Sequence, residues 1–120
     1  PALLEGLKLT KHAAKVGFDW QDTDCIFDKL YEEVGELRQA METRDAGEIS
    51  EELGDLLFVV VNLARRLDVE PETALKKTNR KFRSRFKYIE EQLKKNGKTL
   101  EESDLEEMDS LWDQAKSKGA

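Results

Sequence analysis

Apolar residues recur every three or four positions along most of the chain, and short polar or glycine-containing stretches interrupt them. This spacing is typical of the buried face of an α-helix. It predicts a first helix over residues 3–16, which ends before the sequence GFDW. A second helix is predicted from a cap within residues 22–24 to about Glu42. Its expected buried stripe comprises Ile26, Leu30, Val34, Leu37 and Met41.

A third helix is predicted over residues 48–67, after a turn at RDAG. Its stretch LLFVVVNLA is apolar on almost every side, which a helix at the surface of a small domain does not tolerate. Because one short chain offers few neighbours to cover this helix, we expect a second subunit to complete the core. The sequence therefore predicts an all-α helical bundle completed by dimerisation.

Two more helices are predicted from Pro71 onward, since proline suits the first position of a helix. The fourth extends over residues 71–95, and its expected inward residues are Leu75, Phe82, Phe86, Ile89 and Leu93. Asp104 followed by Glu107 has the spacing of a capping box, with Asp in the place of Ser or Thr. It predicts a short last helix whose apolar face carries Leu105, Met108, Leu111 and Trp112.

The composition fits a single domain over residues 1–120, with 38% hydrophobic and 38% charged residues. A formal net charge of -6 opposes binding to nucleic acid or to an anionic membrane surface. No apolar run approaches the roughly 20 residues of a membrane span. The lone Cys25 favours a reducing compartment, so we expect a cytoplasmic protein. Because the chain starts at Pro1 without Met, we expect it to be a fragment excised from a longer protein.

Two similar acidic sequences, EEVGE at residues 32–36 and EELGD at residues 51–55, lie on the second and third predicted helices. At about 100° per residue, Glu33 and Glu36 line one border of the buried stripe, while Glu32 turns further out. On the next helix Glu52 and Asp55 are again three residues apart. Val59 and Asn62 continue the stripe of Asp55, which places that carboxylate near buried surface.

A carboxylate moved toward an apolar wall must gain a partner, become neutral or bind a cation. Four convergent carboxylates without nearby His or Cys indicate a hard-cation site, suited to Mg²⁺ or Mn²⁺. Zinc is disfavoured, and a di-iron centre would need Glu-x-x-His units, which the single His12 does not supply. The plain alternative is that these glutamates form solvated helix faces.

A basic segment follows, because residues 73–89 contain basic side chains and no acidic one. Lys81 and Arg85 are four residues apart on one side of the fourth predicted helix. Such a pair can hold phosphate oxygens, with Arg acting as a bidentate fork and Lys as a compact charge. A cation site next to basic side chains indicates a polyphosphate substrate, although a solvated basic helix that balances the acidic ones is the simpler alternative.

The sequences EEVGE, EELGDLLFVVVNLAR, NRKFRSRF and LEEMDSLWDQAK together resemble the MazG family of nucleoside triphosphate pyrophosphohydrolases. The similarity covers residues 17–116 and is closest to the C-terminal domain of the two-domain members. It implies an all-α, homodimeric, Mg²⁺-dependent enzyme that cuts nucleoside triphosphates to the monophosphate and pyrophosphate. One departure is Glu48, where members often carry a basic residue shortly before the second acidic motif.

The resemblance also implies roles for individual residues. The metal ligands would be Glu33, Glu36, Glu52 and Asp55. The substrate-binding residues would be Asn79, Lys81, Arg85, Trp112 and Lys116. Either Glu32 or Glu36 could accept the proton of the attacking water, and the sequence does not decide between them. For Trp112, spacing alone favours packing against the bundle, whereas the resemblance favours a lid over the nucleotide.

Two alternatives to this function stay open at the level of sequence. A non-catalytic helical dimerisation or interaction module explains the separation of acidic and basic helices. A related pyrophosphohydrolase acting on dUTP-like or phosphoribosyl nucleotides would use the same chemistry, because substrate choice depends on a few pocket contacts.

Overall fold

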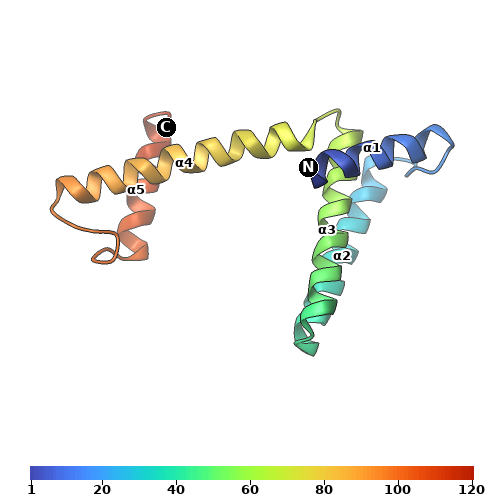
Figure 1. Ribbon diagram of the computed structural model, residues 1–120, viewed down its shortest axis with the longest axis horizontal. Helices are drawn as coiled ribbons and strands as arrows, with labels where there is room; N and C mark the ends of the chain where they lie inside the picture. The colour runs from blue at the N-terminus through green and yellow to red at the C-terminus, as the bar shows by residue number, and fades with distance from the viewer. The chain divides into compact units, whose positions relative to one another are not determined.

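The computed structural model describes all residues 1–120, which form five helices and no strand (Figure 1). The helices are α1 Ala2–Lys15, α2 Thr23–Thr43, α3 Ala46–Arg66, α4 Pro71–Lys95 and α5 Leu105–Ser117. The prediction of an all-α chain is confirmed. No helix combines the length and the apolar character that a membrane crossing requires. The chain divides into two compact units, Pro1–Ala74 and Leu75–Ala120.

In the first unit α3 contacts both α1 and α2, and Figure 1 shows α2 and α3 side by side as a helical hairpin. The hairpin turns at Arg44, whose φ of 56° is left-handed, and at Asp45. Asp45 Oδ1 accepts a hydrogen bond from the backbone N–H of Gly47 at 2.9 Å. This cap starts α3 at Ala46, two residues before the predicted start, so the expected turn at RDAG is shorter than its four residues.

Two other contacts fix the first unit. Asp22 caps α2 by accepting from the backbone N–H of Cys25 at 2.9 Å. Gly6 of α1 lies so close to α3 that an added Cβ would meet Cγ1 of Val61 at 3.3 Å. Buried apolar residues come from all three helices: Leu7, Ile26, Ala40, Val59 and Val61. The predicted α2 stripe is buried at Ile26, but Met41 at its far end is 59% exposed, and its inward placement was wrong.

The apolar surface of α3 is covered by α1 and α2 over only part of its circumference. Leu53, Leu57 and Val60 are 45%, 50% and 45% exposed. Their spacing of four and three residues places them on one side of the helix. An uncovered apolar stripe therefore remains on α3, as the sequence led us to expect of a single chain.

The second unit has its own small core between α4 and α5. Ile89, Leu93 and Leu111 are buried, and partly buried residues pack against them: Phe86, Leu100, Met108 and Trp112. The predicted inward face of α4 was too long, because Leu75 and Phe82 are 48% and 57% exposed. The predicted stripe is correct at Phe86, Ile89 and Leu93, which belong to the core of this unit.

Asp104 caps α5, as predicted, by accepting from the backbone N–H of Glu107 at 2.8 Å. The reciprocal bond of a capping box does not form. Glu107 instead accepts from Ser103 Oγ at 2.6 Å and from Lys98 Nζ at 3.2 Å. These two hydrogen bonds, that from Ser103 first, lower the pKa of Glu107. The side chain thus ties the loop before α5 to the helix.

Candidate functional site

Three carboxylates of the first unit converge between α2 and α3. Glu33 and Glu36 lie one turn apart on α2, and Glu52 lies opposite them on α3. One oxygen of each comes within 4.8 Å of the others. Glu33 is buried, while Glu36 and Glu52 are half-buried. We refer to these three residues as the carboxylate cluster.

The cluster contains more negative charge than the chain compensates. Glu33 Oε1 is paired with Lys29 Nζ at 3.1 Å, and Lys29 also contacts Glu32 Oε1 at 3.2 Å. The bonds to Glu33 and then to Glu32 raise the pKa of Lys29. Glu33 Oε2 and Glu52 Oε2 are buried without any hydrogen-bond partner. Buried carboxylate oxygens without a partner carry a desolvation cost that a cation would offset.

Glu36, the third member of the cluster, lies in a negative environment. Repulsion from Glu33, a hydrogen bond with Glu52 and burial together raise the pKa of Glu36. Three carboxylates whose oxygens lie within 4.8 Å of one another need a positive counter-charge, and a divalent cation supplies one, so the cluster fits a hard cation on charge and on donor type.

Asp55, the fourth predicted ligand, is not part of the cluster. It is exposed, one turn beyond Glu52, and lines a cavity together with Glu33. Glu32 is also exposed and is held by Lys29. Glu48, at the position where a basic residue was expected, accepts from Thr43 Oγ1 at 3.0 Å and so ties the two ends of the α2–α3 turn.

The cavity beside Asp55 has a volume of about 370 Å³ and is mainly apolar. Its apolar lining consists of Leu9, Ala13, Phe18, Trp20, Phe58 and Val59. Its polar lining consists of Thr10, Asp19, Lys29, Glu33, Asp55 and Asn62. A mainly apolar cavity with a few polar groups is the usual form of a small-molecule site. Here it shares Glu33 with the carboxylate cluster.

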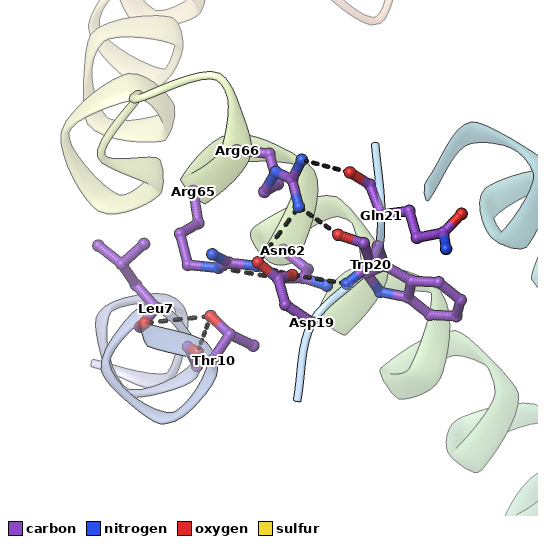
Figure 2. Close-up of polar contacts among 9 residues, drawn as sticks. Leu7, Thr10, Asp19, Trp20, Gln21, Asn62, Arg65 and Arg66 are labelled. Carbon is purple, nitrogen blue, oxygen red and sulfur yellow. Dashed lines mark hydrogen bonds and ion pairs between the residues drawn. The ribbon is translucent and has the colours of Figure 1, made fainter. Parts of the chain in front are cut away.

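The loop between α1 and α2 forms one wall of the cavity and is tied to the end of α3. Asp19 accepts hydrogen bonds from Arg65, from Arg66 Nη1 at 3.2 Å and from the backbone N–H of Trp20 at 2.8 Å (Figure 2). Arg66 also donates to the backbone carbonyls of Trp20 and Gln21. The bond from Arg65, followed by that from Trp20, holds the pKa of Asp19 below its usual value.

Sequence reasoning missed Lys29 and the contact between Asp19 and the two arginines of α3. Lys29 precedes Glu33 by four residues, and this helical spacing could have indicated the ion pair. Asp19 and Arg65 are 46 residues apart, and no local pattern signals a contact over that separation.

The other predicted site residues belong to the second unit. Asn79, Lys81 and Lys116 are exposed there. Arg85 is half-buried, donates from Nε to the backbone carbonyl of Ala120 at 2.9 Å and lies over the ring of Trp112 at 5.2 Å. Trp112 in turn packs against the core of this unit. Arg85 and Trp112 therefore form one local group, to which the exposed residues are not joined by any ion pair.

The chain is similar in sequence to proteins named as nucleoside triphosphate pyrophosphohydrolases. The model of the MazG nucleotide pyrophosphohydrolase domain matches residues 21–89. The chain is 47% identical over 116 residues to the nucleoside triphosphate pyrophosphohydrolase/pyrophosphatase MazG of Thermotoga maritima. It is 43% identical over 120 residues to the nucleoside triphosphate pyrophosphohydrolase of Escherichia coli K12. These matches cover 97% of the chain but only 44% and 45% of the relatives. The chain thus spans less than half the length of either relative.

Proposed function

Because the chain belongs to the family of MazG nucleotide pyrophosphohydrolase domains, we propose that it hydrolyses nucleoside triphosphates to a nucleoside monophosphate and pyrophosphate. The observation that carries this proposal is the carboxylate cluster, with its two buried oxygens lacking partners, at the edge of a mainly apolar cavity. Such a pair of features can accommodate the two ends of a nucleotide: phosphates with a cation, and a base. We further propose that the chain is one domain of a longer protein.

The residues that would hold Mg²⁺, or Mn²⁺, are Glu33, Glu36 and Glu52, with Asp55 as a fourth ligand one turn beyond Glu52. When bound, such a cation supplies neutralisation of the triphosphate charge and polarisation of its phosphoryl oxygens. Lys29 Nζ is paired with Oε1 of Glu33, which leaves Oε2 of Glu33 available to the cation. This ion pair fixes the orientation of the most buried ligand.

The proton of the attacking water is proposed to pass to Glu36 or to Glu32. Glu36 is close to the other carboxylates, but its oxygens are then shared with the cation. Glu32 is exposed, and its Oε1 accepts from Lys29 at 3.2 Å, which leaves Oε2 to take a proton. The residues proposed to bind the substrate itself are Asn79, Lys81, Arg85, Trp112 and Lys116, with the basic members at the phosphates.

The proposed activity is tested by measuring pyrophosphate release from a panel of ribo- and deoxyribonucleoside triphosphates, dUTP included. We expect release that depends on added Mg²⁺, stops with a chelator and returns with Mg²⁺ or Mn²⁺. Release of orthophosphate in place of pyrophosphate would contradict the proposed bond cleavage. Turnover that survives exhaustive chelation would contradict the role of the carboxylate cluster.

We also propose that the chain is a homodimer, because the α3 stripe of Leu53, Leu57 and Val60 has no cover within the chain. Leu57→Glu is expected to convert the dimer to a monomer, since a charge buried at an apolar interface without a partner is strongly unfavourable. Light scattering coupled to size exclusion measures the mass. Leu9→Glu, which alters an exposed leucine on α1, is the control and should leave the mass unchanged. A wild-type chain that is monomeric at all concentrations would contradict the proposal.

A further inference from the structure

Asn62 is a buried polar residue that the proposed chemistry does not use. It lies on α3, is 8% exposed and lines the same cavity as Glu33 and Asp55. A buried amide is costly unless its donor and acceptor groups are satisfied. The partners of its two polar atoms therefore indicate what the cavity is built to receive.

Arg65 determines which way the amide faces. Its Nε and Nη2 donate to Asn62 Oδ1 at 3.1 and 2.8 Å. A guanidinium has only donors, so the oxygen of the amide must face it, and Nδ2 must face the other way. Nδ2 makes no hydrogen bond within the chain and is not sealed from the cavity. Asn62 is thus available to a ligand as a donor only.

Asp19 in turn fixes Arg65. Its carboxylate accepts from Arg65 Nη2, whose side chain is 11% exposed, and Figure 2 shows the chain of contacts from Asp19 through Arg65 to Asn62. Arg66 also binds Asp19, but it makes no contact with Asn62. Both arginines therefore hold the loop through Asp19, but only Arg65 orients the amide.

The separation between Asn62 and the proposed phosphate site beside Asp55 suits a bound nucleotide, with its base at Asn62. It follows Asp55 by seven residues, about 10 Å along a helix axis. The apolar and aromatic lining, including Phe18, Trp20 and Phe58, suits the faces of a planar ring. A ligand whose phosphates lie at the carboxylate cluster would then present the far edge of its base to Asn62.

We propose that Asn62 is a specificity-determining residue, which donates a hydrogen bond from Nδ2 to a keto oxygen on the far edge of the nucleobase. Arg65 and Asp19 are the positioning residues that hold the amide in this orientation. An amino group at the same position of the base would place two donors together and leave the amide without an acceptor. The inference rests on the proposed function and specifies its substrate class: nucleotides with a keto group at position 6 of a purine or position 4 of a pyrimidine.

Matched substrates test this directly, because ITP and ATP differ at and next to position 6, as UTP and CTP do at position 4. For the wild-type chain we expect kcat/KM to be at least about tenfold higher for the keto member of each pair. Asn62→Leu should reduce both ratios to near one. Asn62→Asp should reduce or reverse them, because its free oxygen only accepts. A residue that merely packs would lower kcat/KM for both members of a pair alike.

The two arginines provide a matched control. Arg65→Gln should shrink the keto preference, since the amide is then free to rotate. Arg66→Gln should loosen the same loop and change KM for both members of a pair equally, leaving the ratio intact. Wild-type ratios near one, or ratios unchanged by Asn62→Leu, would overturn the inference while leaving the proposed hydrolysis untouched.

Failure of the proposed function gives a different result. A wild-type chain that releases no pyrophosphate from any triphosphate would contradict the function and not the recognition of the base. Calorimetric titration with the α,β-methylene analogues of ITP and ATP would then compare the two bases without turnover. Tighter binding of the keto analogue that Asn62→Leu abolishes supports the inference, and equal or absent binding of both overturns it.

Discussion

Glu36→Gln and Asp55→Asn are each expected to abolish pyrophosphate release. Both remove a negative ligand oxygen from the proposed cation site, where even outer-shell changes commonly cost roughly 10- to 100-fold. We therefore expect at least about a hundredfold loss of kcat for either variant. The two variants should differ in stability, because Glu36 belongs to the carboxylate cluster and Asp55 does not.

In the metal-free chain Glu36→Gln should be more stable than the wild type at neutral pH. Glu36 is repelled by Glu33, and its pKa is raised above the usual 4.5. A raised pKa in the folded state means that stability is highest below the unfolded value and is lost as pH rises through the folded value. The neutral amide avoids that loss. The stability advantage should therefore disappear below pH 4.5, where the wild-type carboxyl is also neutral.

Chemical denaturation in the presence of a chelator, at several pH values, measures this difference. Glu51→Gln is the matched control, because Glu51 is exposed and precedes Glu52 on α3. It should keep both turnover and the wild-type dependence of stability on pH. Near-normal turnover of Glu36→Gln or Asp55→Asn at saturating Mg²⁺ would contradict the proposed set of four ligands.

The fold could be predicted from the sequence because its helix starts are local features. Asp22 and Asp104 each precede a periodic apolar run and cap the helix that follows. The start of α3 was predicted two residues too late because Asp45, which caps this helix, lies within the sequence RDAG that was assigned to the turn. The exposed positions of Leu75 and Met41 were missed for another reason: periodicity identifies the apolar side of a helix, but not how far along that side a neighbouring helix extends.

Part of the site could also be predicted, because the spacing of residues along a helix is a local feature. Glu33 and Glu36 share a side of α2 by their spacing alone, and a hairpin with α3 brings Glu52 to them. The exposure of Asp55 could not be predicted, because the cavity beside it is made by α1 and by the loop that follows. That loop is positioned by Asp19 and Arg65, whose contact depends on the tertiary fold.

Trp112→Ala is expected to destabilise the chain, as the packing favoured by spacing alone implies. Within the second unit the indole packs against buried Ile89, Leu93 and Leu111, and its ring centroid lies 5.5 Å from that of Phe82. Truncation of a fully buried Trp costs about 3–5 kcal/mol. Since Trp112 is only partly buried, we expect a loss of about 3 kcal/mol or less, including its contact with Arg85.

The proposed substrate-binding role of Trp112 is separated from this packing role by Trp112→Phe. Phenylalanine fills most of the same space, so the free energy of unfolding should stay close to that of the wild type. If the indole stacks on a nucleotide, KM for triphosphates should still rise, because base stacking on an aromatic side chain is worth roughly 1–3 kcal/mol and depends on ring area. Far-UV circular dichroism follows unfolding in both variants without relying on tryptophan emission.

Wild-type stability of Trp112→Ala would contradict the packing, and an unchanged KM in Trp112→Phe would contradict the contact with substrate. A nucleotide that contacts Trp112 should bind the folded wild-type chain more tightly than it binds folded Trp112→Phe. It should therefore stabilise the wild type against unfolding by the larger amount.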